Sequence, residues 1–142
     1  PTTIYFWLAD ALFFQGEYEK ALLTYGKSGG DSLVSPPAWA YAPLGRSNET
    51  RRRVVLLESA WAKPRDPATT KPSKLSRADL AWDLARTYAS LGDRDQAITW
   101  LARSMEHGGY PMDIYLKVHP AFESLRDDPR FRALMKQAGV GM

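Results

Sequence analysis

Two stretches of this 142-residue chain are related to each other and decide its fold. Residues 3–28 have the sequence TIYFWLADALFFQGEYEKALLTYGKS, and residues 79–104 have the sequence DLAWDLARTYASLGDRDQAITWLARS. A shift of 76 positions pairs Leu8 with Leu84, Ala9 with Ala85, Gly16 with Gly92, Ala21 with Ala97 and Ser28 with Ser104. Because the matches recur at helical spacing, they predict an internal repeat made of two helices.

The small residues and glycines of these stretches indicate helical hairpins. Two antiparallel helices approach closely only where side chains are small, so Ala9 and Ala21 are predicted to lie where the first pair crosses. Ala85 and Ala97 take the same positions in the second pair. A glycine lies between the two helices of each pair, where a left-handed backbone conformation costs glycine nothing. Each stretch is therefore predicted to form one hairpin.

The shift is longer than one hairpin of this kind, which has about 34 residues, so one more hairpin and an insertion are expected between the two stretches. Its second helix is predicted from an apolar face, with Asn48 as the cap: Thr50, Val54, Leu57 and Trp61. Its first helix, within residues 35–44, is expected to be short or distorted near Pro43. Residues 63–75 contain prolines and no apolar period, which predicts an exposed loop.

The chain after Gly109 is expected to form short helical segments at residues 113–118, 120–125 and 129–138. Asp128, Pro129 and Gly139 are predicted to cap, start and end the last of them. The final hairpin of a stacked array needs a cover for its apolar face. We expect that cover to consist of Tyr115, Leu116, Phe122, Leu125, Phe131, Leu134 and Met135.

The hairpins resemble tetratricopeptide repeats. The residues that carry this resemblance are Leu8, Ala9, Leu12, Gly16, Tyr18, Ala21 and Tyr25 in the first unit, and Leu84, Ala85, Tyr88, Gly92, Ala97 and Leu101 in the last. The tail, residues 115–140, is similar to the end of bacterial tetratricopeptide regions attached to winged-helix transcriptional regulators, adenylate cyclases and serine/threonine kinases. The resemblance implies a non-enzymatic interaction or regulatory module of a larger bacterial signalling or transcription-regulatory protein.

The predicted fold is all-α, a right-handed superhelix of about three helical hairpins with a C-terminal helical cap. We expect one domain over residues 1–142. Its parts are a first repeat at 3–33, a degenerate second repeat at 34–62, a proline-rich loop at 63–75, a third repeat at 76–109 and the cap at 110–142.

The composition excludes several classes of protein. The chain has no cysteine, a net charge of +3 and 44% apolar residues. Thiol chemistry is thereby excluded, the charge is too small to predict nucleic acid by itself, and no apolar run approaches the ~20 residues that cross a bilayer. Because the chain starts at Pro1 without a recognisable targeting segment, we expect a fragment of a longer protein, with the cytoplasm favoured as its location.

The resemblance also implies a concave groove lined by the first helix of each hairpin. Counting from the glycines places there Phe6, Asp10, Phe13, Trp39, Trp82 and Arg86. Aromatic side chains beside an acid and a base suit a peptide or protein partner, since apolar anchors supply energy and charges set register. Alternatively, these rings simply pack against one another. Self-association of the chain is a further expectation.

Catalytic, metal-binding and cofactor-binding residues are not predicted. His107 and His119 are too few for a metal site, and the acid pairs lie at predicted helix starts, where negative charge is favoured. Two alternatives stay open. A nucleic-acid-binding α-solenoid would use Arg51, Arg52 and Arg53, whereas an all-α enzyme acting on glycans would need Asp10 as its carboxylate.

Overall fold

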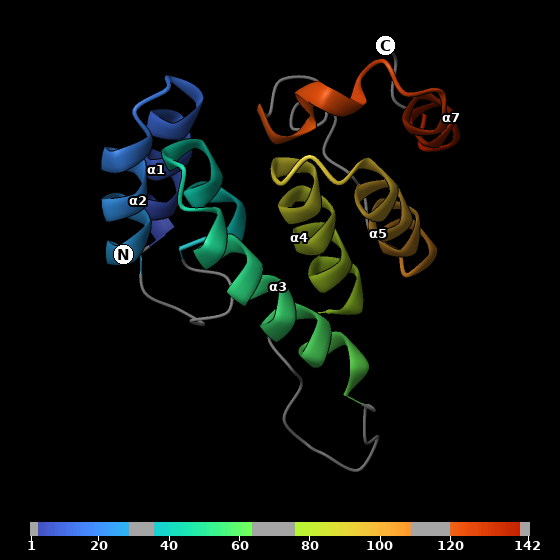
Figure 1. Ribbon diagram of the computed structural model, residues 1–142, viewed down its shortest axis with the longest axis horizontal. Coiled ribbons are helices and arrows are strands. Elements are labelled where there is room, and N and C mark those ends of the chain that lie inside the picture. The colour runs from blue at the N-terminus through green and yellow to red at the C-terminus, as the bar shows by residue number, and fades with distance from the viewer. Residues whose placement is uncertain (1–2, 29–35, 64–75, 109–119, 140–142) are drawn as a thin grey trace.

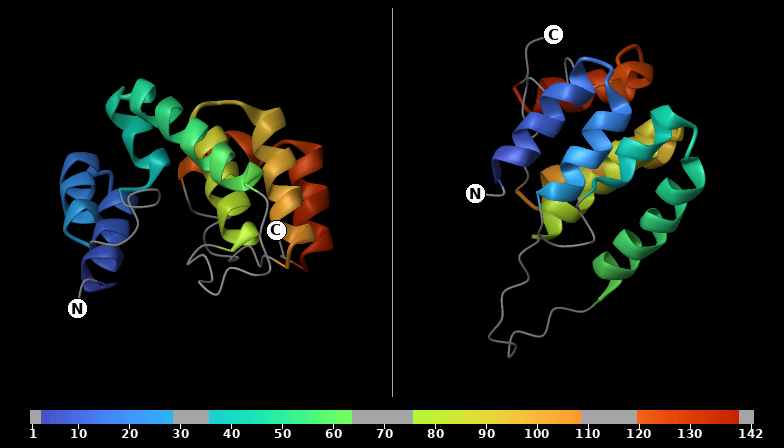
Figure 2. Two further views of the ribbon diagram at one scale, coloured as in Figure 1. Left: turned by 90° about the horizontal axis from the view of Figure 1, so that it is seen from below. Right: turned by 90° about the vertical axis from the view of Figure 1, so that its left-hand side faces the viewer.

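The computed structural model describes residues 3–28, 36–63, 76–108 and 120–139, and each regular element in these ranges is helical (Figure 1). The α-helices are α1 (Thr3–Phe14), α2 (Tyr18–Lys27), α3 (Ser47–Ala62), α4 (Arg77–Ser90), α5 (Arg94–Glu106) and α7 (Pro129–Gln137), and the 3-10 helices are η1 (Ala38–Leu44) and η2 (Pro120–Leu125). The first hairpin forms one end of the molecule and α7 the other (Figure 2). The predicted all-α architecture is confirmed.

The two related stretches fold as helical hairpins, α1 with α2 and α4 with α5. The glycines between the helices take the left-handed conformation, with φ of +83° at Gly16 and +80° at Gly92. No surface is exposed on the alanines predicted at the crossings: Ala9, Ala21, Ala85 and Ala97. The small side chains thus allow the close approach of the helices that the repeat predicted.

The third hairpin, formed by α4 and α5, has a side-chain cap at the start of each helix. Ser76 Oγ accepts from the Asp79 backbone N–H at 3.0 Å, and Asp79 accepts from the Ser76 N–H at 3.4 Å, which completes a capping box. Asp93 Oδ1 accepts from the Gln96 N–H at 3.2 Å at the start of α5. The first hairpin differs, because Glu17, at the N-cap of α2, makes no side-chain capping bond.

The middle unit begins with a 3-10 helix in place of an α-helix. η1 contains Pro43 and ends at Gly45, which has φ of +72°. Proline offers no N–H for an i→i−4 bond, so the tight, short form follows from the sequence. The expectation of a short or distorted helix here is confirmed.

Helix α3 carries the predicted apolar face but not the predicted cap. Thr50, Val54 and Leu57 are buried, and the Thr50 hydroxyl donates to the Ala38 carbonyl at 2.9 Å. The assignment of Asn48 as the cap was wrong. The N-cap residue is Arg46, two positions earlier, and the helix starts at Ser47. The Arg46 side chain makes no capping bond and forms an ion pair of 2.6 Å with Glu49.

Two apolar clusters make up the core of the described residues. The larger draws on α3, α4, α5, η2 and α7, and the smaller consists of residues of α1 and α2 with Trp39 and Ala40 of η1. Ala38, one position before Trp39, belongs to the larger cluster. The short helix η1 is therefore the joint through which the first hairpin is attached to the rest of the molecule.

The C-terminal segment covers the third hairpin. Four predicted cover residues are at most 1% exposed: Phe122, Leu125, Phe131 and Met135. Asp128 accepts from the Arg130 N–H at 2.9 Å at the start of α7, Pro129 takes the first turn, and Gly139 follows the helix with φ of +77°. These predictions are confirmed, whereas Tyr115, Leu116 and the helical segment expected at 113–118 lie outside the described residues.

The remaining expectations about organisation stay predictions. Residues 64–75, most of the expected insertion, are not among those described, and the exact limits of the repeats are not tested by the helix bounds. Among the described segments, no helix combines the length and apolar character needed to span a membrane.

Candidate interaction groove

The six predicted groove residues come from α1, η1 and α4, and they differ in exposure. Asp10, Phe13 and Trp39 are buried, with exposed fractions of 5%, 2% and 2%. The remaining three, Phe6, Trp82 and Arg86, are partly exposed. Side chains with so little exposed surface offer little contact area to a partner, so the three buried residues belong mainly to the core. Their assignment to binding stays a prediction.

Aromatic rings connect the first hairpin to η1. The Phe13 and Trp39 ring centroids lie 4.8 Å apart at 81°, and those of Tyr25 and Trp39 lie 5.9 Å apart at 86°. Phe6 approaches Tyr25 in the same edge-to-face manner, at 5.4 Å. Such pairs are worth about 0.5–1.5 kcal/mol beyond their area burial. The alternative that the rings pack against one another therefore describes this end of the predicted groove.

Asp10 has a structural partner inside the first hairpin. Its carboxylate accepts a hydrogen bond from the Tyr25 hydroxyl of α2, and both residues are buried. A buried carboxylate is costly unless it is hydrogen-bonded, so this bond accounts for an acid in an otherwise apolar helix. The glycan-acting alternative needs a carboxylate that opens into the groove, and Asp10 does not provide one.

Arg86 lies between the two tryptophans of the predicted groove. Its guanidinium carbon is 5.4 Å from the Trp39 ring centroid and 5.2 Å from that of Trp82, within the range of cation–π attraction. It forms an ion pair with Asp83, one helical turn before it on α4. Burial raises the pKa of the Asp83 carboxyl above its usual range, against the opposing effect of the Arg86 charge.

Asp83 is a residue that the sequence analysis missed. The signal was present, since an acid three residues before an arginine on one helix is a common ion-pair spacing. Sequence alone did not show that the pair lies beside two indole rings, with only 17% and 12% of the Asp83 and Arg86 side chains exposed. This pair places a fixed positive group beside the aromatic rings.

A pocket of about 440 Å³ opens between the first hairpin, η1, the α4–α5 turn and η2. Its lining consists of Phe13, Trp39, Ala42, Pro43, Ala89, Ser90, Gly92, Pro120, Ala121, Glu123 and Ser124. Phe13 and Trp39 are the two predicted groove residues that reach it. Apolar and small side chains dominate this lining, which suits an apolar side chain of a ligand, with Glu123 as the one charged group.

Most residues of the pocket wall were not predicted from the sequence, because they come from distant parts of the chain. Pro43 lies in η1 and Pro120 starts η2, and only the packing of both 3-10 helices near the α4–α5 turn brings them together. Pro43 was interpreted as a local distortion of a helix, and residue 120 as the start of a short helical segment. Nothing in their local sequence indicates a shared cavity.

The basic run of α3 is not a uniform exposed patch. Arg51 and Arg52 are exposed, whereas Arg53 is partly buried and donates to the Pro36 carbonyl at 2.9 Å. Its guanidinium also lies 5.9 Å from the Tyr41 ring centroid. One of the three arginines is thus used to hold η1 against α3, which weakens the case for a phosphate-binding run.

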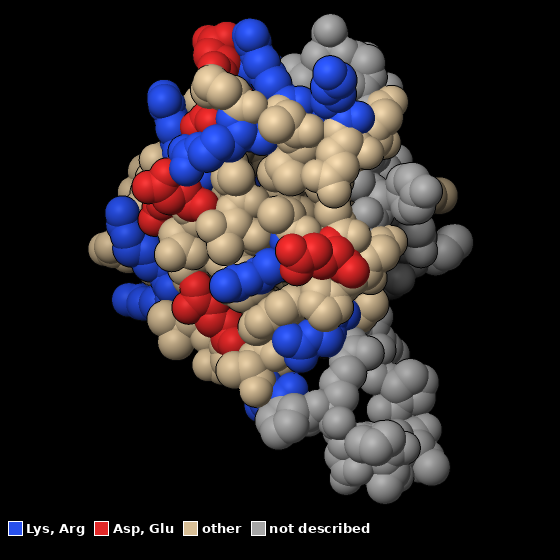
Figure 3. Space-filling model, turned by 90° about the vertical axis from the view of Figure 1, so that its right-hand side faces the viewer, with Lys and Arg blue, Asp and Glu red and all other residues tan. Residues whose placement is uncertain are grey.

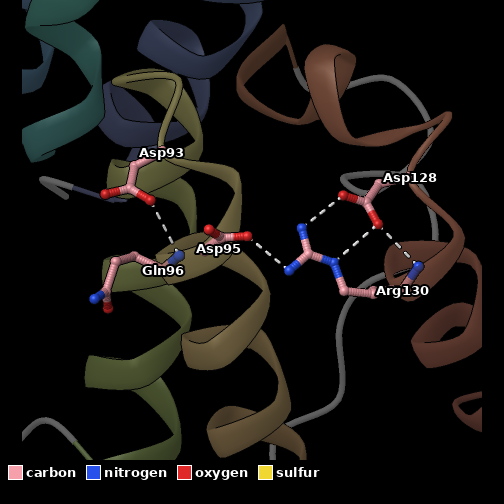
Figure 4. A network of polar contacts seen from close by, with 5 residues as sticks. All are labelled: Asp93, Asp95, Gln96, Asp128 and Arg130. Carbon is pink, nitrogen blue, oxygen red and sulfur yellow. Dashed lines mark hydrogen bonds and ion pairs between the residues drawn. The ribbon is translucent and has the colours of Figure 1, made fainter.

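Asp93 and Asp128 act as caps at helix starts, and Asp128 and Asp95 share one interhelical network (Figure 4). Arg130 of α7 donates to Asp95 of α5 at 2.7 Å and to Asp128 at 2.9 Å. Hydrogen bonds from the side chain and the backbone N–H of Arg130 lower the pKa of the Asp128 carboxyl to about 2. These contacts confirm capping roles for Asp93 and Asp128 and tie the cap to the third hairpin.

On the face that carries α5 and α7, the described residues form no patch of a single charge sign (Figure 3). Acidic and basic side chains alternate over it, and several of them pair, as Arg132 does with Asp127 at 3.4 Å. A polyanion binds best to a continuous basic surface, which this face does not offer.

Of the two histidines, His107 is among the described residues. His107 follows α5 and its ring packs edge-to-face on Trp61 at 5.2 Å, while His119 is not among the described residues. Within the described parts, no group of three or more histidines and carboxylates is arranged to hold a metal ion.

Comparisons with known proteins agree with the internal repeat. A family model described as tetratricopeptide repeat matches residues 2–28 and 78–106, the two stretches that align with each other. These matches support a tetratricopeptide repeat domain, and together with the helices they show an all-α fold of the tetratricopeptide-like kind. No curated protein and no solved structure matched the chain significantly. Tetratricopeptide repeats generally mediate protein–protein interaction and are typically non-enzymatic.

Proposed function

We propose that this tetratricopeptide-like chain is a non-enzymatic protein-interaction module that binds a peptide segment of a partner protein in its concave groove. The pocket of about 440 Å³ carries this proposal. Its walls come from the first hairpin, η1, the α4–α5 turn and η2, and the groove between stacked hairpins is where such a fold offers a concave surface. An apolar side chain of the peptide fills this pocket.

The charges beside the pocket suggest how the peptide is oriented. Arg86 is held by Asp83 and by two indole rings, and Glu123 lies at the pocket wall. A cation and an anion on different sides of an apolar anchor site favour one direction of the bound chain. In this proposal Phe6, Asp10 and Trp82 support the groove and do not supply its main contacts.

The setting of the module is also part of the proposal. The similarity of residues 115–140 to the ends of bacterial tetratricopeptide regions supports a role in assembling or regulating an attached signalling or transcription-regulatory domain. A pull-down or reporter assay of the full-length protein, with and without a filled pocket, tests this role. Regulation that is unaffected by the filled pocket contradicts it.

A phage-displayed library of random 15-residue peptides provides the direct test of binding. We expect enrichment of peptides that share one large apolar residue. Fluorescence anisotropy of an enriched peptide should then show at least about tenfold weaker binding to Ala42→Phe, a loss of about 1.4 kcal/mol. Ala42 is a partly exposed residue of the pocket wall, so a phenyl ring there fills the space without entering the core.

Val55→Ser is the matched control, because Val55 is 63% exposed on α3 and does not line the pocket. Binding should be unchanged in this variant. If no peptide is enriched, or if Ala42→Phe and Val55→Ser bind equally well, the proposed groove function is wrong. Binding of a random oligonucleotide that falls steeply with salt would favour the nucleic-acid alternative instead.

A further inference from the structure

Helix α1 is apolar on the side that faces away from its own hairpin. Three large side chains on that side are about half exposed or more: Ile4 at 62%, Trp7 at 57% and Leu8 at 49%. With Ala11 they follow the spacing 4, 7, 8 and 11, which places them in one stripe along the helix. Tyr5 and Phe14, each 40% exposed, border this stripe. We call these six residues the outer α1 face.

In the third hairpin, the equivalent helix face is buried against other helices. The 76-residue shift pairs Ile4 with Leu80 and Leu8 with Leu84, and these leucines of α4 are 5% and 0% exposed. Both belong to the larger apolar cluster, together with Val54 and Leu57 of α3. The positions that are exposed in α1 are thus the positions that pack against another helix in α4.

Exposed apolar side chains in such a row are unusual for a helix that faces only water. A helix that is hydrophobic on all sides normally lies inside a protein or against a partner. Singly scattered apolar residues need no explanation, but a contiguous row along a whole helix marks an interaction surface. The outer α1 face therefore calls for an occupant of helical form.

We propose that the occupant is the outer α1 face of a second copy of this chain, with the two α1 helices antiparallel across a two-fold axis. In such an isologous contact the same patch of both copies meets, with residue i of one copy facing residue j of the other and j facing i, so a patch with a net charge would repel itself. The only charged residue between Thr3 and Phe14 is Asp10, which is buried and bonded to Tyr25 on the other side of the helix. The outer α1 face is uncharged, so two copies of it can meet without charge repulsion.

The spacing of the stripe fits packing of one helix on another. Ile4, Trp7, Ala11 and Phe14 follow the alternating three- and four-residue steps with which helices interlock their side chains. The small residue, Ala11, lies in the middle of this row and allows close approach, as Ala9 does in the crossing inside the hairpin. Two such rows can therefore interdigitate over about three helical turns.

The area available is enough for a dimer of moderate affinity. The large side chains of the face expose on the order of 500 Å² in each copy, so pairing buries roughly 1,000 Å² in total. That total is at the lower limit of specific interfaces, which predicts a reversible dimer with a dissociation constant in the micromolar range. The first hairpin lies at one end of the molecule, where a second copy has room to approach (Figure 2).

Sedimentation velocity of the whole 142-residue chain, from about 1 to about 200 µM, tests the proposal. We expect a monomer that converts to a dimer with rising concentration. Leu8→Asp and Ile4→Lys should each remain monomeric over this range. Leu8 lies near the middle of α1 (Thr3–Phe14), so Leu8→Asp places like charges near the axis, whereas Ile4→Lys would bury a charge against the apolar face of the partner. Both positions are half exposed or more in the single chain, so circular dichroism should show folded proteins with unchanged helix content.

Two further samples make the test specific to this geometry. Leu23→Asp adds a charge on α2 at a residue that is 72% exposed, and it should dimerise as the parent does. An equimolar mixture of Leu8→Asp and Leu8→Arg should form a heterodimer, because opposite charges then meet across the axis. A parent that stays monomeric, a dimer that survives Leu8→Asp, or assembly that grows beyond the dimer would each overturn the proposal.

Discussion

The first and third hairpins share a sequence pattern but differ in their surroundings. α4 and α5 lie between α3 and η1 on one side and η2 and α7 on the other, whereas the apolar cluster of α1 and α2 is completed by η1 (Figure 1). Leu84 is consequently completely buried while its counterpart Leu8 is 49% exposed. A repeat thus specifies a local hairpin, and the neighbouring elements determine how much of it is buried.

The same difference appears in the polar contacts. The third hairpin has a complete capping box at Ser76, a capping bond from Asp93 and the Arg130 network that attaches α7. The first hairpin has an uncapped α2, and its buried side-chain hydrogen bonds include those from Tyr25 to Asp10 and from Ser28 to the Tyr25 carbonyl. We therefore expect the third hairpin to be the more stable of the two, and the first to open at lower denaturant concentration.

Phe131→Ala should have the largest effect, because it removes a fully buried ring from the cover of the third hairpin. We expect it to lower the free energy of unfolding by about 3–5 kcal/mol, measured from urea or guanidinium denaturation. The ring lies 6.1 Å from that of Phe122, which in turn stacks on Trp82 of α4. A loss below about 1 kcal/mol would mean that the cap contributes little to the core.

The pair Leu84→Ala and Leu8→Ala tests the comparison at matched positions. Leu84→Ala should cost about 2–5 kcal/mol because it leaves a cavity in a packed core. Leu8→Ala should cost less than about 1 kcal/mol, because half of that side chain already meets water. Both should be measured at a protein concentration at which the chain is monomeric. Equal losses would show that the two hairpins are buried alike, against the structure.

The pair Asp93→Ala and Glu17→Ala separates the helix starts of α5 and α2. Asp93→Ala removes a side-chain cap and should lower the free energy of unfolding by about 1 kcal/mol. Glu17 makes no capping bond and pairs only with Lys20 on the surface, so Glu17→Ala should change stability by about 0.5 kcal/mol or less. Thermal melts of both variants measure the difference, and a reversed order would refute it.

The protonation of Asp128 should have the smallest effect on the stability of the fold. Its pKa in the folded chain is lowered to about 2, so its contribution to stability is present above the unfolded pKa near 4 and is lost as the pH falls toward 2. NMR of the side-chain carboxyl carbon should show the pKa rising in Arg130→Gln, although the capping N–H of residue 130 remains. Arg132→Gln, which loses a bond to Asp127, is the control and should leave this pKa in place.

Local features of the fold followed directly from the sequence. The hairpins, the left-handed glycines and the caps at Ser76, Asp93 and Asp128 depend on residues within a few positions of one another. Such interactions are predictable because propensity and capping operate over one or two helical turns. The cap of α3 was the exception, since the helix starts after Arg46, whose side chain makes no capping bond and pairs with Glu49.

The candidate site could be predicted from the sequence only in part. Phe13 and Trp39 were predicted and do line the pocket, but Pro43 and Pro120 were not associated with it. Asp83 was not identified as the partner of Arg86. The pocket combines four segments that are far apart in the chain. Arg86 was predicted to line the groove, which stays a prediction; its guanidinium lies over two indole rings and pairs with Asp83, an arrangement that the sequence did not indicate.

The sequence by itself determined that this chain forms helical hairpins, where they turn, and which residues lie at their crossings. Only the tertiary structure decided which apolar residues are buried, because burial depends on helices from distant parts of the chain. Ile4 and Leu80 have the same place in the repeat, yet their exposed fractions are 62% and 5%. The physical reason is that hydrophobic burial is not directional: a helix stripe specifies that it needs a neighbour, and the packing of the whole chain determines whether it has one.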